Sequence, residues 1–241
     1  MSAPRTTAAR NPQRSRAARR GAGATRQPLS RARIVEAALA LVDQEGLSAL
    51  STRRLGVRLR CEAMSIYHHF PSKQHLLDAM VDHVIGGIEL PPGGGDALQR
   101  VRETLVAYRA MAHRHPAFFP YVAVHRLNTP TGVRFIDRVL GLIRAAVVDD
   151  QLAARYFRVV GYYLVGAALD ETAGYAKGPS AAEPVDDATI RAECPELTRA
   201  APYFQRGHWD ATFDLGIDAL MVAMAADAKP AKAASTPSRR R

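Results

Sequence analysis

The stretch Ser51–Lys73, STRRLGVRLRCEAMSIYHHFPSK, decides the fold class of this 241-residue chain. It has the pattern of two short helices joined by a tight turn. Ser51 or Thr52 can cap the first helix, because a side-chain hydroxyl accepts a free backbone N–H at a helix start. Leu55 and Leu59, one turn apart, give that helix a single apolar stripe.

The second helix of this stretch repeats the four-residue apolar spacing with Ile66 and Phe70. Pro71 ends it, because the residue before a proline disfavours the helical conformation. With that face buried, Met64 and His68 point away from it. Residues 52–73 hold five basic side chains and one acid. A short helix that presents small and polar groups beside such cations fits the major groove of DNA.

Three runs of sequence carry a resemblance to a known family. They are IVEAALALVDQEGL at 34–47, STRRL at 51–55 and SIYHHFPSKQHLLDAM at 65–80. Together they are similar to the DNA-binding domain of the tetracycline-repressor (TetR) family, and YHHFPSK is the most specific local signature among them. Two positions depart from the family pattern. Arg60 stands where the family usually has a turn glycine, which would cost about 1–2 kcal/mol for a left-handed residue. Gly56 replaces a common helical alanine, at about 1 kcal/mol.

The resemblance implies which residues meet DNA. By position, Arg53 reaches a base edge or a phosphate, while Tyr67 and Lys73 hold phosphates. Met64 can touch a thymine methyl group. The full set of expected DNA contacts is Thr52, Arg53, Ala63, Met64, Ser65, Tyr67, His68 and Lys73.

The rest of the chain predicts an all-α fold, because helical apolar spacing continues after residue 96 and no strand-like alternation appears. The Pro and Gly run at 91–95 separates two domains. We expect a three-helix helix-turn-helix domain at 29–90, joined by a helix from residue 72 to a larger helical domain at 96–226. Within the larger domain, Val133, Ile136, Leu140 and Ile143 predict the buried stripe of one helix. Basic tails at 1–28 and 227–241 flank the two domains.

The net charge of +10 is concentrated in these tails. Residues 1–28 hold seven arginines and no acid, and residues 229–241 hold five basic residues and no acid. Because both tails lack a hydrophobic repeat, we expect them to be disordered. They could hold DNA phosphates or reach a minor groove, or they could be solvated extensions without a dedicated contact.

Cellular location follows from what the chain lacks. It shows neither a secretory signal nor an apolar run long enough to span a membrane. Its two cysteines, Cys61 and Cys194, show no metal spacing, which favours reducing cytoplasm.

The helices predicted at 149–171 and 210–226 are the most apolar outside the DNA-binding unit. In the family, the equivalent last helices pair with those of a second subunit, and FDLGIDAL at 213–220 is similar to the carboxy-terminal signature of that class. The alternative is that these faces are buried within one chain. We expect a homodimer, because a palindromic operator needs two reading heads.

Aromatic and polar residues gather between 108 and 163, as in a small-molecule site that is mostly apolar with a few polar groups. Arg126 and His125 are the best candidates for a polar anchor. His113 and His115 are two residues apart, so on a helix they diverge, and we discount a metal site. No cofactor is expected. The expected ligand contacts are Tyr108, Met111, His115, Phe118, His125, Arg126, Phe157 and Tyr163.

Three functions remain open at this point. The resemblance favours a repressor that leaves an inverted-repeat operator when a small, largely apolar effector binds. A constitutive, architectural DNA binder would need no pocket. An enzyme would use His115 or His125 as a base, with Asp137 or Glu171 to orient it. No nucleophile elbow, metalloprotease motif or phosphate-cradling glycine loop supports catalysis.

Overall fold

The structure, a computed structural model, describes residues 28–174 and 181–228, so most of both predicted tails lies outside the described residues. Apart from one isolated bridge between Val147 and Ala228, the described part of the chain is helical, as expected. Within these ranges, no helix has both the length and the apolar character needed to cross a membrane.

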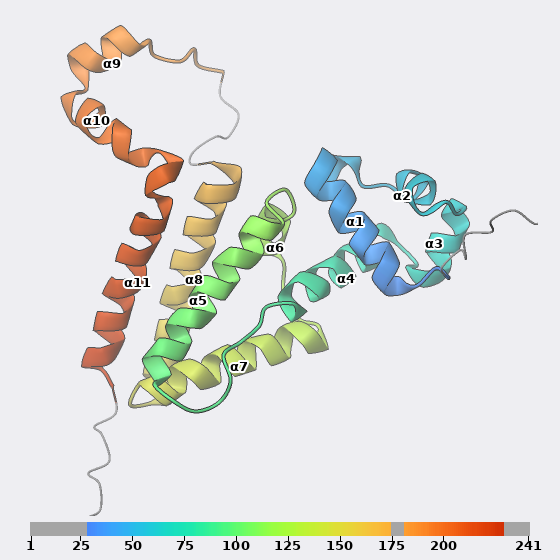
Figure 1. Cartoon of the computed structure of the whole chain (residues 1–241), viewed down its shortest axis with the longest axis horizontal. Helices are drawn as coiled ribbons and strands as arrows, with labels where there is room; N and C mark the ends of the chain where they lie inside the picture. The colour runs from blue at the N-terminus through green and yellow to red at the C-terminus, as the bar shows by residue number, and fades with distance from the viewer. Residues whose placement is uncertain (1–27, 175–180, 229–241) are drawn as a thin grey trace, which may run out of the picture.

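The amino-terminal helices form a compact head at one end of the molecule (Figure 1). Its elements are α1 (Arg31–Glu45), α2 (Thr52–Leu59), α3 (Ala63–His69) and α4 (Lys73–Gly86). Ser30, Ser51 and Ser72 cap α1, α2 and α4, because each hydroxyl accepts the N–H of the residue three positions later at 3.3 Å. The core beneath them includes Leu55 and Ile66, which are fully buried.

The turn between α2 and α3 explains both departures from the family pattern. Arg60 is the one non-glycine residue with a positive φ in the described ranges, at φ 55° and ψ 46°, so it occupies the left-handed conformation. The N–H of Cys61 then donates to the Gly56 carbonyl at 2.9 Å. A Cβ on Gly56 would lie 2.7 Å from the Cys61 carbonyl oxygen. The helical glycine is therefore required by the close approach of the turn.

The larger helical region follows a linker at 87–96. Its main elements are α5 (Ala97–Arg114), α6 (Phe119–Val124), α7 (Pro130–Ala146), α8 (Asp150–Ala173) and α11 (Trp209–Ala226). Thr129 and Asp149 cap α7 and α8 by accepting the backbone N–H groups of Gly132 at 3.1 Å and Leu152 at 2.8 Å. In Figure 1, α5, α8 and α11 run side by side, and α7 crosses beneath them toward the head.

The predicted buried stripe of α7 is wrong, because the buried face of the helix is rotated from it by part of a turn. Val133 is 53% exposed, whereas Phe135, Val139 and Ala146 are buried and only Ile143 belongs to both stripes. Gly132 sets the rotation of the helix, because a Cβ there would lie 2.9 Å from that of Leu127. The helix carries two overlapping apolar stripes, and this close packing turns the second one inward.

A buried polar cluster joins α5, α8 and α11. The Arg109 guanidinium binds both carboxylate oxygens of Glu171 at 2.7 and 2.9 Å and donates to Asp210 at 2.8 Å. Burial acts to lower the pKa of Arg109, but the bonds to Glu171 and Asp210 outweigh it, and the net shift is upward. His113 Nε2 also contacts Glu171 at 2.7 Å. Because the Glu171 side chain is only 5% exposed, these contacts hold α5, α8 and α11 together at this point along their lengths.

Between α8 and α11 the chain forms an arm of short elements that projects from the body (Figure 1). These are α9 (Asp187–Glu193), α10 (Pro195–Ala200) and two 3₁₀ turns (Ala201–Phe204 and Arg206–His208). Of the arm residues 181–208, none is fully buried. The predicted loop at 177–187 and helical patch at 188–201 match this segment where it is described.

The chain after α11 begins with two anchored residues rather than a free tail. Asp227 O accepts the N–H of Val148 at 3.1 Å, and its carboxylate accepts the Tyr156 hydroxyl at 2.7 Å. Burial and this bond together raise the pKa of Tyr156 to about 12. The tail predicted to start at residue 227 therefore holds two ordered residues first. Residues 229–241 lie outside the described part.

Candidate DNA-binding surface and small-molecule cavity

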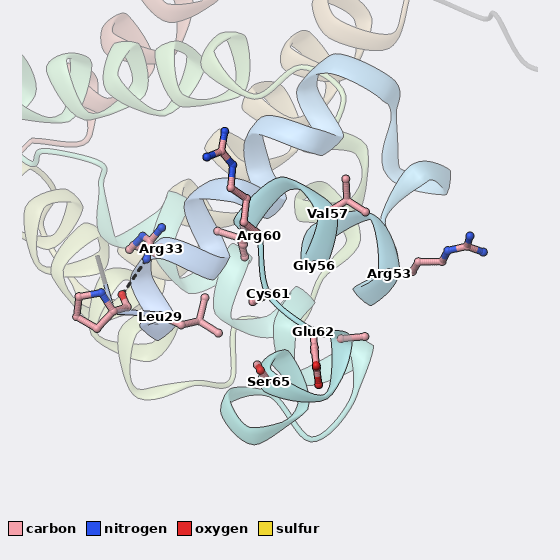
Figure 2. Close-up of a pocket in the computed structure, with 12 residues that line it drawn as sticks. Leu29, Arg33, Arg53, Gly56, Val57, Arg60, Cys61, Glu62 and Ser65 are labelled. Carbon is pink, nitrogen blue, oxygen red and sulfur yellow. Dashed lines mark hydrogen bonds between the residues drawn. The ribbon is translucent and has the colours of Figure 1, made fainter. Parts of the chain in front are cut away.

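A groove of about 710 Å³ opens on the head where α1, α2 and the turn into α3 meet. Arg53 of α2 and Ala63 and Ser65 of α3 line it, as does Arg33 of α1 (Figure 2). Arg33 also donates to the Pro28 carbonyl at 2.9 Å, which ties the start of the described chain to this groove. Three of the predicted DNA contacts thus share one concave surface.

A second groove, of about 320 Å³, lies where the amino-terminal ends of α2 and α4 meet. It is lined by Thr52, Tyr67 and Lys73, three more of the predicted DNA contacts, beside the caps Ser51 and Ser72. Free N–H groups and the positive ends of two helix dipoles point toward such a position, which suits a phosphate.

The remaining two predicted DNA contacts, Met64 and His68, line neither groove. Both are exposed on α3, and the Met64 side chain is 62% accessible. Its position on the short helix is consistent with contact to a base.

The cations of the head do not have equal freedom. Arg54 forms an ion pair with Glu45, and Arg58 donates to Gln44 at 2.8 Å, so both are held against α1. Among the described residues, neither Arg53 nor Lys73 has a side-chain partner, which leaves both available to DNA.

Three charged residues that line the first groove are not among the predicted DNA contacts. They are Arg33, Arg60 and Glu62. Arg60 could have been found from its turn position, since a left-handed residue turns its side chain out of the helix pair. Arg33 could not, because only the fold brings α1 beside the turn.

The larger helical region contains a separate cavity of about 170 Å³ between α5, α7 and α8. Its wall is almost entirely apolar, and its only hydroxyl groups come from Thr104 and Tyr108. The Thr104 hydroxyl is already used, donating to the Arg100 carbonyl at 2.9 Å. The lining residues are Thr104, Leu105, Tyr108, Leu127, Phe135, Ile136, Val139, Phe157, Val160, Gly161, Leu164 and Val165.

Tyr108 is the polar group that a molecule in this cavity would meet. Burial raises its pKa to about 12, so the phenol stays protonated and can donate a hydrogen bond at neutral pH. Among the described residues its hydroxyl has no hydrogen-bond partner. Its ring packs edge-on against Phe119, with centroids 6.0 Å apart.

Of the eight predicted ligand contacts, Tyr108 and Phe157 line the cavity and the other six do not. Met111 and Phe118 are buried in the core. The Tyr163 hydroxyl donates to the Phe213 carbonyl at 2.7 Å and holds α8 to α11. The predicted anchor Arg126 is exposed, because it lies in the loop after α6 and points to solvent.

The two remaining histidines connect the larger region to the head. His115 Nδ1 lies 2.9 Å from an Asp43 carboxylate oxygen on α1. His125 Nε2 lies 3.4 Å from Asp78 on α4. Neither contacts the acids expected to orient a catalytic base, because Asp137 is on the exposed side of α7 and Glu171 is bound by Arg109. The two histidines belong to the joint between the regions.

Helix α4 is held across this joint by polar contacts along its length. Gln74 Nε2 donates to the Tyr121 hydroxyl at 2.9 Å, and the Thr129 hydroxyl donates to Asp82. At its end, α4 packs on α7, with Gly86 beside Thr131. Since α7 also lines the cavity, it touches both the cavity and α4.

Comparison with known proteins bears on both regions. Residues 34–80 match the family described as "Bacterial regulatory proteins, tetR family". Residues 91–227 match "Tetracyclin repressor-like, C-terminal domain".

Individual relatives match long stretches of the chain. The chain is 32% identical to an HTH-type transcriptional regulator of Saccharopolyspora erythraea, over 85% of this chain and 88% of that one. It is 37% identical to the transcriptional repressor DrrR1 of Streptomyces coeruleorubidus, over 58% of this chain and about half (52%) of that relative. The crystal structure of the TetR family protein ActR of Streptomyces coelicolor in complex with actinorhodin has a similar fold. Its TM-score is 0.65 at 27% identity, and the match covers 84% of this chain and 100% of that one.

These matches cover the head and the helical region together. This chain therefore belongs to the TetR family of bacterial transcriptional regulators, with a helix-turn-helix unit at its amino-terminal end and a larger helical domain after it.

Proposed function

We propose that this protein is a transcriptional repressor that binds an inverted-repeat operator as a homodimer. A small, largely apolar effector would release it by occupying the cavity between α5, α7 and α8. The observation that carries the proposal is the position of α7, which lines the cavity and packs on α4. Because such a regulator acts on chromosomal DNA, we place it in the cytoplasm.

The DNA side of the proposal rests on the two grooves. Arg53, Ala63 and Ser65 on the first groove, with Met64 beside them, are placed to read base edges. Thr52, Tyr67 and Lys73 on the second groove, with His68 nearby, are placed to hold phosphates. The grouping separates the residues that choose a sequence from those that fix the protein on the duplex.

The chemistry of the effector follows from the cavity. An apolar wall with one unused donor, the Tyr108 hydroxyl, favours a mostly hydrophobic molecule that carries a hydrogen-bond acceptor. The complex of ActR with actinorhodin supports a small-molecule effector, and the name of DrrR1 supports repression.

The dimer is proposed from exposed apolar residues on the last two long helices. On α8, Val159 and Tyr162 are exposed, and on α11, Leu215 and Val222 are 72% and 71% exposed. The two helices pack on each other at Gly216, where a Cβ would lie 2.2 Å from the Tyr163 ring, so their outer faces form one continuous surface. Burying such a surface against a second copy would remove it from water.

The experiment screens small apolar molecules for release of the operator and repeats each hit on cavity variants. In the structure, a Cβ on Gly161 meets open space, so a side chain can start there. Gly161→Leu would extend into the cavity, and Gly161→Ala would leave most of it open. We expect hits to weaken wild-type operator binding by about 5–150-fold. Gly161→Leu should abolish this effect and Gly161→Ala should retain it, with unchanged operator affinity when no ligand is present.

The proposal fails if hits act equally on wild type and Gly161→Leu, because release would then not use this cavity. Finding binders that leave operator affinity untouched would favour a constitutive DNA-binding protein instead.

A further inference from the structure

A further cleft lies beside the second half of α7, where residues of the linker after α4, of α5 and of α7 line it. It has a volume of about 260 Å³ and shares no lining residue with the apolar cavity. Its lining residues are Leu90, Pro91, Arg100, Arg138, Gly141 and Leu142.

The cleft holds two cations and no acid. Every Asp and Glu of the chain falls within residues 28–174 and 181–228, and none of them forms an ion pair with Arg100 or Arg138. Nearby arginines on the same two helices are paired. Arg102 on α5 contacts Asp214 and Asp218, and Arg144 on α7 contacts Asp150. Arg114 on α5 and Arg134 on α7 also form no ion pair in the described part of the chain, but neither lines this cleft, which brings two such cations together.

One polar atom in the cleft is left without a partner although it is buried. The Arg100 Nε is inaccessible to solvent and has no hydrogen-bond acceptor in the described part of the chain. A buried, unsatisfied N–H on a charged group is costly, and such groups in native proteins usually have a partner. An anion bound in the cleft would supply it once a small shift of the Arg100 side chain exposes Nε.

We propose that this cleft binds a compact anion through a phosphate or carboxylate group held by Arg100 and Arg138. Guanidinium groups recognise both groups through paired N–H donors. Leu90 and Leu142 offer an apolar wall for a short hydrocarbon portion. A Cβ on Gly141 would meet open space, so the backbone of α7 leaves room for the ligand.

Because of the position of the cleft, a bound anion would contact three parts of the molecule at once. Leu90 and Pro91 belong to the linker that directly follows α4, so a bound anion would tie this linker to α5 and α7. On α5, the Arg100 carbonyl accepts the hydroxyl of Thr104, which lines the apolar cavity one turn away. The site is nevertheless separate from the proposed effector site and does not depend on it.

The first test is isothermal titration of the full-length protein with inorganic phosphate and, separately, with succinate, at constant ionic strength set by chloride. We expect at least one of the two to bind. Arg100→Gln and Arg138→Gln should each weaken binding by about tenfold or more, since a charged hydrogen-bonding partner is lost. Arg114→Gln removes the same charge from α5 about 21 Å farther along the helix and should have no effect.

A second test needs no ligand and replaces the anion with a side chain. Gly141→Glu places a carboxylate in the cleft, and Gly141→Gln is a matched neutral control. We expect Gly141→Glu to melt at a higher temperature than Gly141→Gln, and the difference to disappear in the Arg100→Gln, Arg138→Gln background. Gly141→Glu should also lose binding of the anion.

Binding of phosphate alone would assign a phosphate ligand, and binding of succinate alone a carboxylate ligand. The proposal is overturned if neither anion binds, or if Arg114→Gln weakens binding as much as Arg100→Gln. It is also overturned if Gly141→Glu is no more stable than Gly141→Gln.

Discussion

At the scale of single residues, Arg53 and Lys73 are two cations of the head that have no partner among the described residues. They lie in different grooves, and this difference predicts different roles. Lys73→Ala should weaken binding to operator and random DNA alike and lower the salt slope by about one, because a phosphate contact carries no base identity. Arg53→Ala should also reduce the preference for operator, as expected for a base contact.

Fluorescence anisotropy with operator and random duplexes at several salt concentrations measures both effects. Arg58→Ala is a suitable control, since Arg58 is already held by Gln44. An equal loss on both duplexes for Arg53→Ala would assign Arg53 to the DNA backbone instead.

How far residues could be predicted from sequence differs between the two regions. In the head, caps and turn residues act over three or four positions, so Ser51, Arg60 and Pro71 could be interpreted locally. In the larger domain, the predicted polar anchor does not line the cavity. Arg126 is a plausible anchor by residue type, but only tertiary packing shows that it is exposed and that Tyr108 carries the unused hydroxyl.

At the scale of elements, helix positions follow from the sequence more reliably than helix rotation. Caps and prolines set where α7 and α8 begin, at Thr129-Pro130 and Asp149. The inward face of α7 could not be chosen, because Val133 and Phe135 belong to two stripes of similar apolar character. The contact between Leu127 and Gly132 decides between the two stripes. Leu127 lies in a loop, so the apolar periodicity of the helix cannot predict this contact.

The outer faces of α8 and α11 give the prediction at this scale. Leu215→Glu, combined with Val222→Glu, should convert the proposed dimer to monomer, because two carboxylates would have to be buried in the interface. Val133→Glu places the same charge on an exposed position of α7 and should leave assembly unchanged. Sedimentation velocity at micromolar concentration measures the change. A monomeric wild type, with and without DNA, would contradict the dimer.

At the scale of the whole molecule, the proposed function requires that ligand binding acts on DNA binding through the joint between the two regions. It consists of side-chain contacts between α1 or α4 and the segment 115–131, including His115 with Asp43 and Gln74 with Tyr121. Such contacts can exchange partners without unfolding either region. An effector acts only through its different affinity for the DNA-competent and DNA-incompetent arrangements.

The central claim is that effector binding in the cavity and operator binding by the head are coupled. Such coupling must be reciprocal. The most direct measurement takes one effector from the screen and titrates it into free protein and into protein saturated with operator. We predict that operator weakens effector binding by the same factor by which effector weakens operator binding, about 5–150-fold. Equal affinity of the effector for free and operator-bound protein would contradict the account.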